Sequence, residues 1–149
     1  MITETQQGKK SRPELYEMLE NIAKAKSRKD KIDLVKSYVG TYQAFADYLR
    51  CVFDPRINFL LPESRPPFDL AEEEHVPSTW HKQHMKLKYF VKGGPQMHEL
   101  KRETMFIGML ESVHPRDAEF LVMMLAKKTV CKGLTESVIK EAAPQLLSS

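Results

Sequence analysis

Apolar residues recur every three to four positions along most of this chain, which is the spacing of amphipathic helices. In the first periodic stretch these positions are Leu15, Met18, Leu19 and Ile22. Ser11, Pro13 and Glu14 provide a capping hydroxyl, a first-turn proline and a glutamate three residues after the serine. The pattern therefore predicts a helix that begins at this signal and ends near Lys24.

Two more helices are predicted directly after the first. Ser27 is an N-cap candidate for the second helix, which Gly40 can terminate. Thr41 can cap the third helix, which ends at Asp54 and Pro55 because proline disfavours helix at the residue before it. The expected buried faces are Ile32, Leu34, Val35 and Tyr38 in the second helix and Phe45, Tyr48, Leu49, Val52 and Phe53 in the third.

Residues 58–77 are the least regular part of the sequence. The run Asn-Phe-Leu-Leu at residues 58–61 is too short to decide between strand and helix. Four prolines lie within residues 62–77, so we expect an extended, ordered, proline-rich loop there.

Four further helices are expected, beginning at Ser78 or Thr79, near Met97, at His114 and near Thr135. The first of them runs through Val91 and the second ends at Ser112, while the last ends by Pro144. No segment alternates between apolar and polar residues over a useful length. The prediction is an all-α fold, a single compact domain of six or seven helices over residues 12–149, preceded by a flexible segment at residues 1–11.

Composition is ordinary for one globular domain, since 42% of the 149 residues are hydrophobic and 29% are charged. No apolar run is long enough to span a bilayer, and the start does not resemble a signal peptide. We therefore expect a cytoplasmic protein with no membrane partner. Cys51 and Cys131 are far apart in sequence, so we expect two reduced thiols rather than a zinc site.

Charge is segregated along the chain, although the formal net charge is only +3. An acidic segment contains Glu63, Asp69, Glu72, Glu73 and Glu74. One basic segment contains Lys82, Lys86, Lys88, Lys92, Lys101 and Arg102, and another contains Lys24, Lys26, Arg28, Lys29 and Lys31. This distribution favours an anionic partner at the basic segments, and it is also common on helices that are merely solvated.

No motif for catalysis is present. The sequence contains no phosphate-binding loop, no dinucleotide fingerprint and no nucleophile elbow. His81 and His84 are three residues apart but lack a nearby cysteine or aspartate that would complete a familiar ligand set. We therefore predict a non-catalytic binding protein with no metal, no cofactor and no small-molecule substrate.

Two basic glycine turns are the strongest binding feature. Gly93 and Gly94 follow Lys92 and precede the helix that carries Lys101 and Arg102, while Gly133 follows Lys128 and Lys132. Glycine allows the backbone to approach a polyanion, and amides at a helix start can donate to phosphate oxygens. The alternative is that these glycines only end helices.

The order of helices and basic turns resembles the all-helical N-terminal DNA-binding domain of the ATP-dependent DNA ligases of tailed phages. The resemblance extends from about Leu19 to Leu147, through residues 22–31, 49–53 and 117–147. Lys128 and Gly133 occupy places where that family has a basic residue and a glycine before an amphipathic helix. The chain also looks like a family of short uncharacterised tailed-phage proteins, on residues 53–59, 87–91 and 101–107.

The ligase resemblance implies contact with the backbone and minor groove of duplex DNA, without ligation, because the K-x-D-G motif is absent. The expected function is a phage DNA-binding accessory protein that grips duplex backbone without sequence specificity. Its candidate contacts are Lys92, Gly93, Gly94, Lys101 and Arg102, then Lys128, Lys132 and Gly133, and finally Lys26, Arg28 and Lys29. The alternative is an adaptor or inhibitor that binds a phage or host replication, transcription or defence protein, with residues 62–77 as a docking element.

Overall fold

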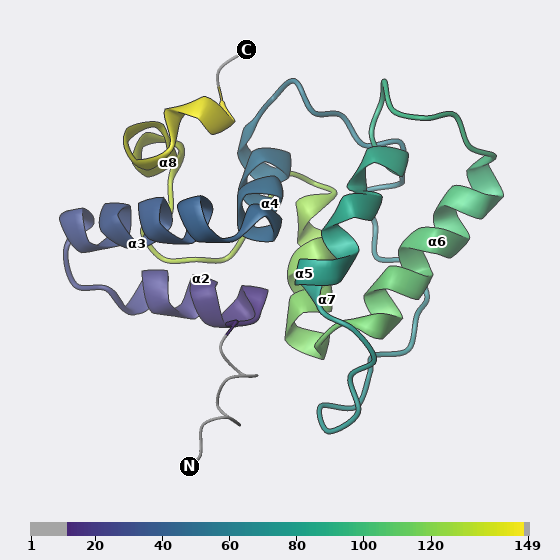
Figure 1. Cartoon of the computed structure of the whole chain (residues 1–149). Coiled ribbons are helices and arrows are strands. Elements are labelled where there is room, and N and C mark those ends of the chain that lie inside the picture. Colours follow the sequence, from purple (N-terminus) through teal and green to yellow (C-terminus); the bar gives the residue numbers. More distant parts are fainter. Residues whose placement is uncertain (1–11, 148–149) are drawn as a thin grey trace.

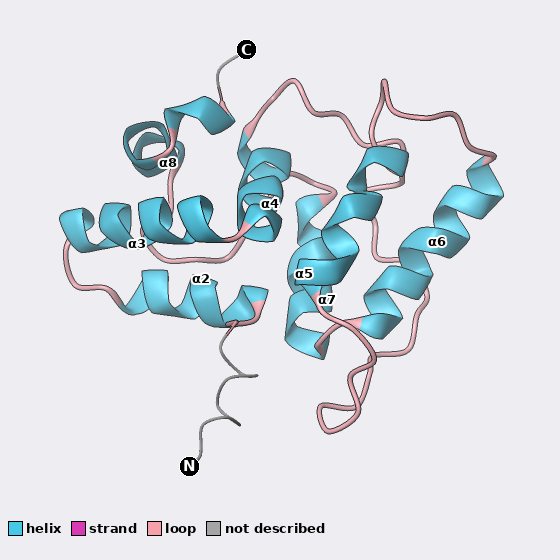
Figure 2. Cartoon of the chain, in the orientation of Figure 1, coloured by secondary structure: helices cyan, strands magenta, loops and turns pink. Residues whose placement is uncertain are grey.

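The computed structural model describes residues 12–147, which form helices joined by loops and contain no β-strand (Figures 1 and 2). The α-helices are α2 (Leu15–Lys24), α3 (Arg28–Thr41), α4 (Gln43–Phe53), α5 (Trp80–Gln83), α6 (Glu99–Ser112), α7 (Pro115–Met124) and α8 (Glu136–Ala142). The two 3-10 helices are η1 (His84–Tyr89) and η2 (Pro144–Leu146). The predicted all-α fold is confirmed, whereas the segment predicted to be flexible, residues 1–11, lies outside the described residues. Within the described residues, no helix is both long and apolar enough to cross a membrane.

Helix α4 forms the centre of the molecule because α3, α5, η1 and α7 all pack against it. Its buried side chains are Ala44, Phe45, Ala46, Tyr48, Leu49, Cys51 and Val52. They surround most of the helix, as expected for a helix enclosed by others. The indole Nε1 of Trp80 donates to the carbonyl of Ala44 at 2.8 Å and so joins α5 to α4.

The remaining helices form two groups on either side of α4 (Figure 1). On one side, α3 lies between α2 and α8 and contacts both helices. On the other side, α6 packs against α7. The connection between α7 and α8 passes behind α3 and α4 to join the two groups.

Several predicted helix starts are confirmed by caps. The hydroxyl of Ser27 accepts from the backbone N–H of Asp30 at 3.0 Å, and Thr79 and Thr135 cap α5 and α8 in the same way. The ring nitrogen Nδ1 of His114 accepts from the backbone N–H of Arg116 at 3.1 Å. These caps satisfy backbone donors that have no partner inside the helix.

Two predicted boundaries near the N-terminal helices are wrong. The N-cap of α2 is Glu14 rather than Ser11, because Glu14 and Glu17 form a reciprocal capping box. Helix α3 continues through Gly40 to Thr41, and Tyr42 is both its C-cap and the N-cap of α4. Gly40 has a helical environment with open space around it, so nothing there requires the helix to end.

The predicted helix over residues 79–91 is also corrected. It is α-helical only to Gln83, continues as η1, and ends at Tyr89. Val91 instead forms an isolated antiparallel bridge with Phe59, and the backbone N–H of Lys92 donates to the carbonyl of Asn58 at 2.8 Å. This long-range pairing holds residues 58–60 extended and withdraws residues 90–92 from the helix.

Candidate nucleic-acid interface

The N-terminal basic segment lies at the connection between α2 and α3, where two of its predicted contact residues are already paired. Arg28 donates to Oε1 of Glu141 at 2.6 Å and to the hydroxyl of Ser137 at 2.7 Å, which ties α3 to α8. Lys29 forms an ion pair with Asp33 at 3.0 Å. Lys26 is exposed, so it remains accessible to an outside anion.

Lys31 brings the two sequence-distant basic segments together. Its Nζ donates to the carbonyls of Ile22 and Ala23 at 2.8 and 3.1 Å and so covers the C-terminal end of α2. Its stem lies against Gly133, where an added Cβ would come within 2.6 Å of Lys31 Cε. Gly133 also has φ +79°, a left-handed conformation that favours glycine. The segment around Gly133 therefore lies directly beside the α2–α3 connection.

Residues 125–135, which we call the strap, link α7 to α8 and are held at several points. The hydroxyls of Tyr48 and Thr129 are 2.7 Å apart, and Sγ of Cys131 donates to the carbonyl of Leu19 at 3.2 Å. Burial raises the pKa of Cys131 to about 11, so this thiol is kept protonated as a donor. Lys128 and Lys132 are exposed on the strap between these anchors.

The exposed lysines of this region are not paired with carboxylates of the neighbouring helices. Within residues 12–147, no carboxylate forms an ion pair with Lys26, Lys128 or Lys132. The carboxylates of α3 and α8 that do form ion pairs are Asp33 with Lys29, Glu141 with Arg28 and Glu136 with Lys140. We call the surface that carries Lys26, Lys128 and Lys132 the strap face.

The other predicted glycine turn, at Gly93 and Gly94, is not adjacent to the start of α6. Four residues separate Gly94 from α6, whose N-cap is His98, so the turn does not present the first amides of the helix. The guanidinium of Arg102 is half-buried and donates to the carbonyls of Tyr89 and Met97 at 3.1 and 2.9 Å. Arg102 therefore holds the turn in place instead of extending toward an anion.

Lys92 and Lys101 are exposed, and the segments that carry them lie at the opposite end of the molecule from the α2–α3 connection (Figure 1). The turn that carries Lys92 and the start of α6 are on the right of the view, whereas the α2–α3 connection is on the left. The structure thus brings Gly133, at the end of the predicted contact over residues 128–133, beside the α2–α3 connection that carries the contact over residues 26–29. It separates the third predicted contact, at residues 92–102, from them.

Gly94 is needed for the backbone conformation of its turn, because a Cβ there would overlap the carbonyl oxygen of Lys88. We expect Gly94→Ala to lower the free energy of unfolding by about 2 kcal/mol, the usual cost of forcing atoms into filled space. Gly108→Ala is the matched control, because Gly108 lies inside α6 with open space around it. There alanine should raise stability by about 0.5–1 kcal/mol. Urea denaturation measures both, and equal effects of the two substitutions would contradict the account.

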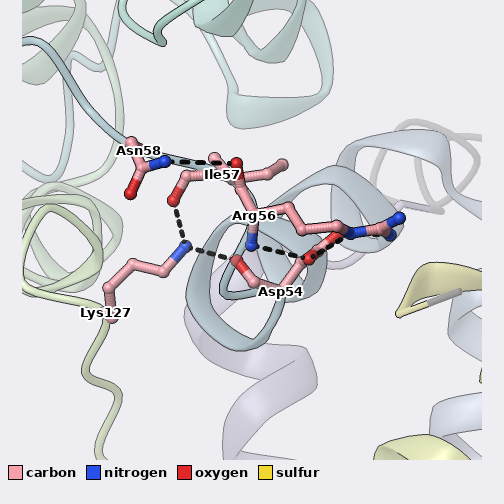
Figure 3. Close-up of polar contacts among 5 residues, drawn as sticks. All are labelled: Asp54, Arg56, Ile57, Asn58 and Lys127. Atoms are coloured by element: carbon pink, nitrogen blue, oxygen red, sulfur yellow. Dashed lines mark hydrogen bonds and ion pairs between the residues drawn. The ribbon is translucent and has the colours of Figure 1, made fainter. Parts of the chain in front are cut away.

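Lys127 is a structural residue that the sequence patterns did not single out. Its Nζ donates to the carbonyls of Asp54 and Ile57 at 2.8 and 2.9 Å (Figure 3). Lys127 has φ 59°, which is uncommon for a residue with a side chain. Figure 3 shows that the lysine approaches the turn at residues 54–58 from the strap, while Arg56 faces the carboxylate of Asp54 from the other side. A positive φ cannot be read from residue type, so sequence offered no signal for this role.

Titratable groups also gather where α2 begins. Asp117 on α7 is fully buried and accepts from the backbone N–H groups of Tyr16 and Leu15 at 2.8 and 3.3 Å. Burial raises its pKa to about 7, and burial lowers the pKa of the neighbouring His81 and His114. These groups cap the start of α2 and pack against it.

Within the described residues, no group of three or more His, Cys, Asp or Glu side chains could hold a metal ion.

The fold and the strap face together define a small all-helical protein that presents lysines on an ordered connection between helices. The chain belongs to a family of unknown function, DUF6433, whose model matches residues 18–130. No curated protein and no solved structure matches the chain. None of these findings links it to phage ligases or to a tailed-phage origin, so both remain expectations from sequence resemblance.

Proposed function

We propose that this protein is a non-catalytic DNA-binding accessory protein that contacts the backbone of duplex DNA through the strap face, without sequence specificity. The observation that carries the proposal is the contact between Lys31 and Gly133, because it joins two basic segments that are about 100 residues apart in sequence. Lys26, Lys128 and Lys132 are the residues that contact phosphate in this proposal.

The chemistry of these side chains supports contact with phosphate rather than with bases. A lysine ammonium is a point charge on a flexible stem, which suits a phosphate oxygen but carries no sequence information. The strap holds Lys128 and Lys132 on ordered backbone, because Thr129 and Cys131 are anchored to α4 and α2. Ordered backbone lowers the conformational cost of binding.

Three phosphate contacts imply weak and salt-dependent binding. The logarithm of the affinity should fall with the logarithm of salt concentration with a slope of about −2.7, since each neutralised phosphate contributes about −0.9. Between about 50 and 200 mM salt this corresponds to a loss of roughly 40-fold. Affinity should be the same for duplexes of unrelated sequence.

The test is fluorescence anisotropy of a short labelled duplex over a salt series. The double variant Lys128→Gln with Lys132→Gln should bind roughly tenfold more weakly and reduce the magnitude of the slope by about 2. The matched control is Lys92→Gln with Lys101→Gln, which removes the same charge from the opposite end and should leave affinity nearly unchanged. The proposal fails if the wild-type protein does not bind at low salt, or if both double variants weaken binding equally.

A further inference from the structure

A groove with an apolar floor and a basic rim lies between α4 and η1. It has a volume of about 370 Å³. Ile57, Leu87 and Val91 contribute apolar side chains, while Arg50 and Lys88 contribute positive charge. We call it the η1 groove.

Two features of the η1 groove suit an acidic segment with an apolar anchor. Met85 lines it and is 67% exposed, which is unusual for a large apolar side chain and leaves its sulfur and methyl group available for contact. The carboxylate of Asp47 also lines the groove, but it is engaged by His84 Nδ1 at 2.6 Å and by Gln43 Nε2 at 2.8 Å. Lys88 Nζ lies 5.3 Å from the ring centroid of Tyr89. Within the described residues, neither Arg50 nor Lys88 forms an ion pair, so both charges can attract an outside carboxylate.

The chain itself exposes a segment of this chemistry at residues 70–75, which we call the acidic tip. Leu70 is 45% exposed, and Glu72, Glu73 and Glu74 are exposed beside it. The backbone N–H of His75 donates to the carbonyl of Glu72 at 2.9 Å and closes the turn. The acidic tip thus combines carboxylates with one apolar side chain.

The loop that carries the acidic tip is fixed to the body of the protein. Arg65 forms an ion pair with Glu119 and stacks 4.5 Å from the ring centroid of Phe68. The backbone N–H of Asp69 donates to Oε2 of Glu111 at 2.9 Å. These contacts confirm the prediction of an ordered loop. A tip projected from an anchored loop loses little conformational freedom when it binds.

The acidic tip cannot reach the η1 groove of its own molecule. In Figure 1 the turn at residues 72–75 hangs at the lower edge of the view, below α5, whereas η1 and the end of α4 lie in the upper half. A separation seen in projection is a lower limit on the separation in space. A groove and a tip on opposite sides of one molecule are suited to pairing between molecules.

We propose that the acidic tip of one molecule docks in the η1 groove of a second copy and produces head-to-tail self-association. Glu72, Glu73 and Glu74 face Arg50 and Lys88, and Leu70 packs beside Met85. Such an interface is heterologous, so association extends with concentration unless a ring closes. The contact is small and exposed, so it is weak and is screened by salt. It does not depend on the proposed DNA binding, which uses the different residues Lys26, Lys128 and Lys132.

Sedimentation velocity on protein freed of nucleic acid tests this directly. At low ionic strength the average mass should rise with protein concentration, and at about 0.5 M salt it should return to that of the monomer. Wild-type protein that stays monomeric over the whole low-salt series would overturn the proposal.

Reversing the charges of the acidic tip and of the η1 groove tests whether these two surfaces pair. The tip variant Glu72→Lys, Glu73→Lys, Glu74→Lys and the groove variant Arg50→Glu, Lys88→Glu should each be monomeric, because like charges then meet. An equal mixture should associate again, since the reversed tip fits the reversed groove and the two native surfaces still fit each other. Association that survives in either variant alone, or a mixture that stays monomeric, would show that these surfaces do not pair.

Competition by a peptide tests the same contact in the wild-type protein, without any variant that has to fold. A synthetic peptide of residues 68–76 in excess should reduce the average mass of the wild-type protein at low salt. The same peptide with Leu70→Asp should be at least severalfold less effective, although it carries one more negative charge. Equal inhibition by the two peptides would show that Leu70 does not contribute to docking.

Discussion

The free energy of unfolding should fall by up to about 4 kcal/mol as pH rises from about 4 to about 7, through the carboxyl group of Asp117. This side chain is fully buried, and its pKa is raised from 3.8 to about 7, first by burial and then by the neighbouring charge of Glu14. The backbone N–H groups of Tyr16 and Leu15 donate to it and act in the opposite direction, but they do not overcome burial.

The sign follows from where the proton is held. The native protein keeps the proton on Asp117 up to about pH 7, whereas the unfolded chain releases it near pH 3.8. The stability that this group contributes is therefore complete below pH 3.8 and is lost as pH rises through about 7. Glu14 also has a raised pKa and adds to this slope, while the lowered pKa values of His81 and His114 oppose it below about pH 6.5.

Comparison with Asp117→Asn isolates the group from these other contributions. The stability of wild type relative to this variant should fall by about 1.4 kcal/mol per pH unit between pH 4 and 7 and change sign at about pH 6.4. At pH 5 the variant should be less stable by about 2 kcal/mol, because an amide nitrogen cannot accept a backbone N–H bond. Urea denaturation at stepped pH gives both values.

Glu119→Gln is the control, since Glu119 lies on the same helix but is partly exposed. Its stability should differ from wild type by a nearly constant amount over this pH range. Parallel curves for wild type and Asp117→Asn would show that Asp117 does not titrate as described.

Lys127→Met should lower the free energy of unfolding by about 3 kcal/mol. Methionine retains most of the stem but removes the donor shared by the carbonyls of Asp54 and Ile57 (Figure 3). Asp54 is buried, so its carbonyl would have little access to replacement water. Burial lowers the pKa of Lys127, and the nearby charge of Asp54 acts in the opposite direction.

Lys128→Met is the matched control, because Lys128 is exposed and adjacent in sequence. Its effect on stability should stay within about 0.5 kcal/mol. Chemical denaturation of the two variants at neutral pH makes the comparison. The role of Lys127 would be refuted if both substitutions had the same small effect.

The boundaries of helices show how far local information reaches. Helices begin at Ser27, Thr79, His114 and Thr135 as predicted, because each of these side chains accepts from a backbone N–H two or three residues away. The helix predicted over residues 79–91 was shortened by pairing with residues 58–60, which the sequence around it could not reveal. Tertiary contacts of this kind override local preference.

The candidate site shows the same division. Residue type and spacing identified basic segments at residues 24–31, 82–102 and 128–133. They could not show that both arginines bond to other parts of the chain. Arg28 pairs with Glu141 on α8, and Arg102 donates to the carbonyl groups of Tyr89 and Met97. The cations left for a partner are therefore fewer than the sequence suggested, and they lie on two separate surfaces.

By itself, the sequence determined that the chain is helical, where most helices begin, and that its charge is segregated. These properties depend on apolar periodicity and on hydrogen bonds between residues a few positions apart. The tertiary structure alone decided that Lys31 meets Gly133, that Asp117 caps α2 and that the acidic tip lies opposite the η1 groove. The physical reason is that these contacts join residues that are distant in sequence, and packing around α4 selects them from many pairings that the same residues could form.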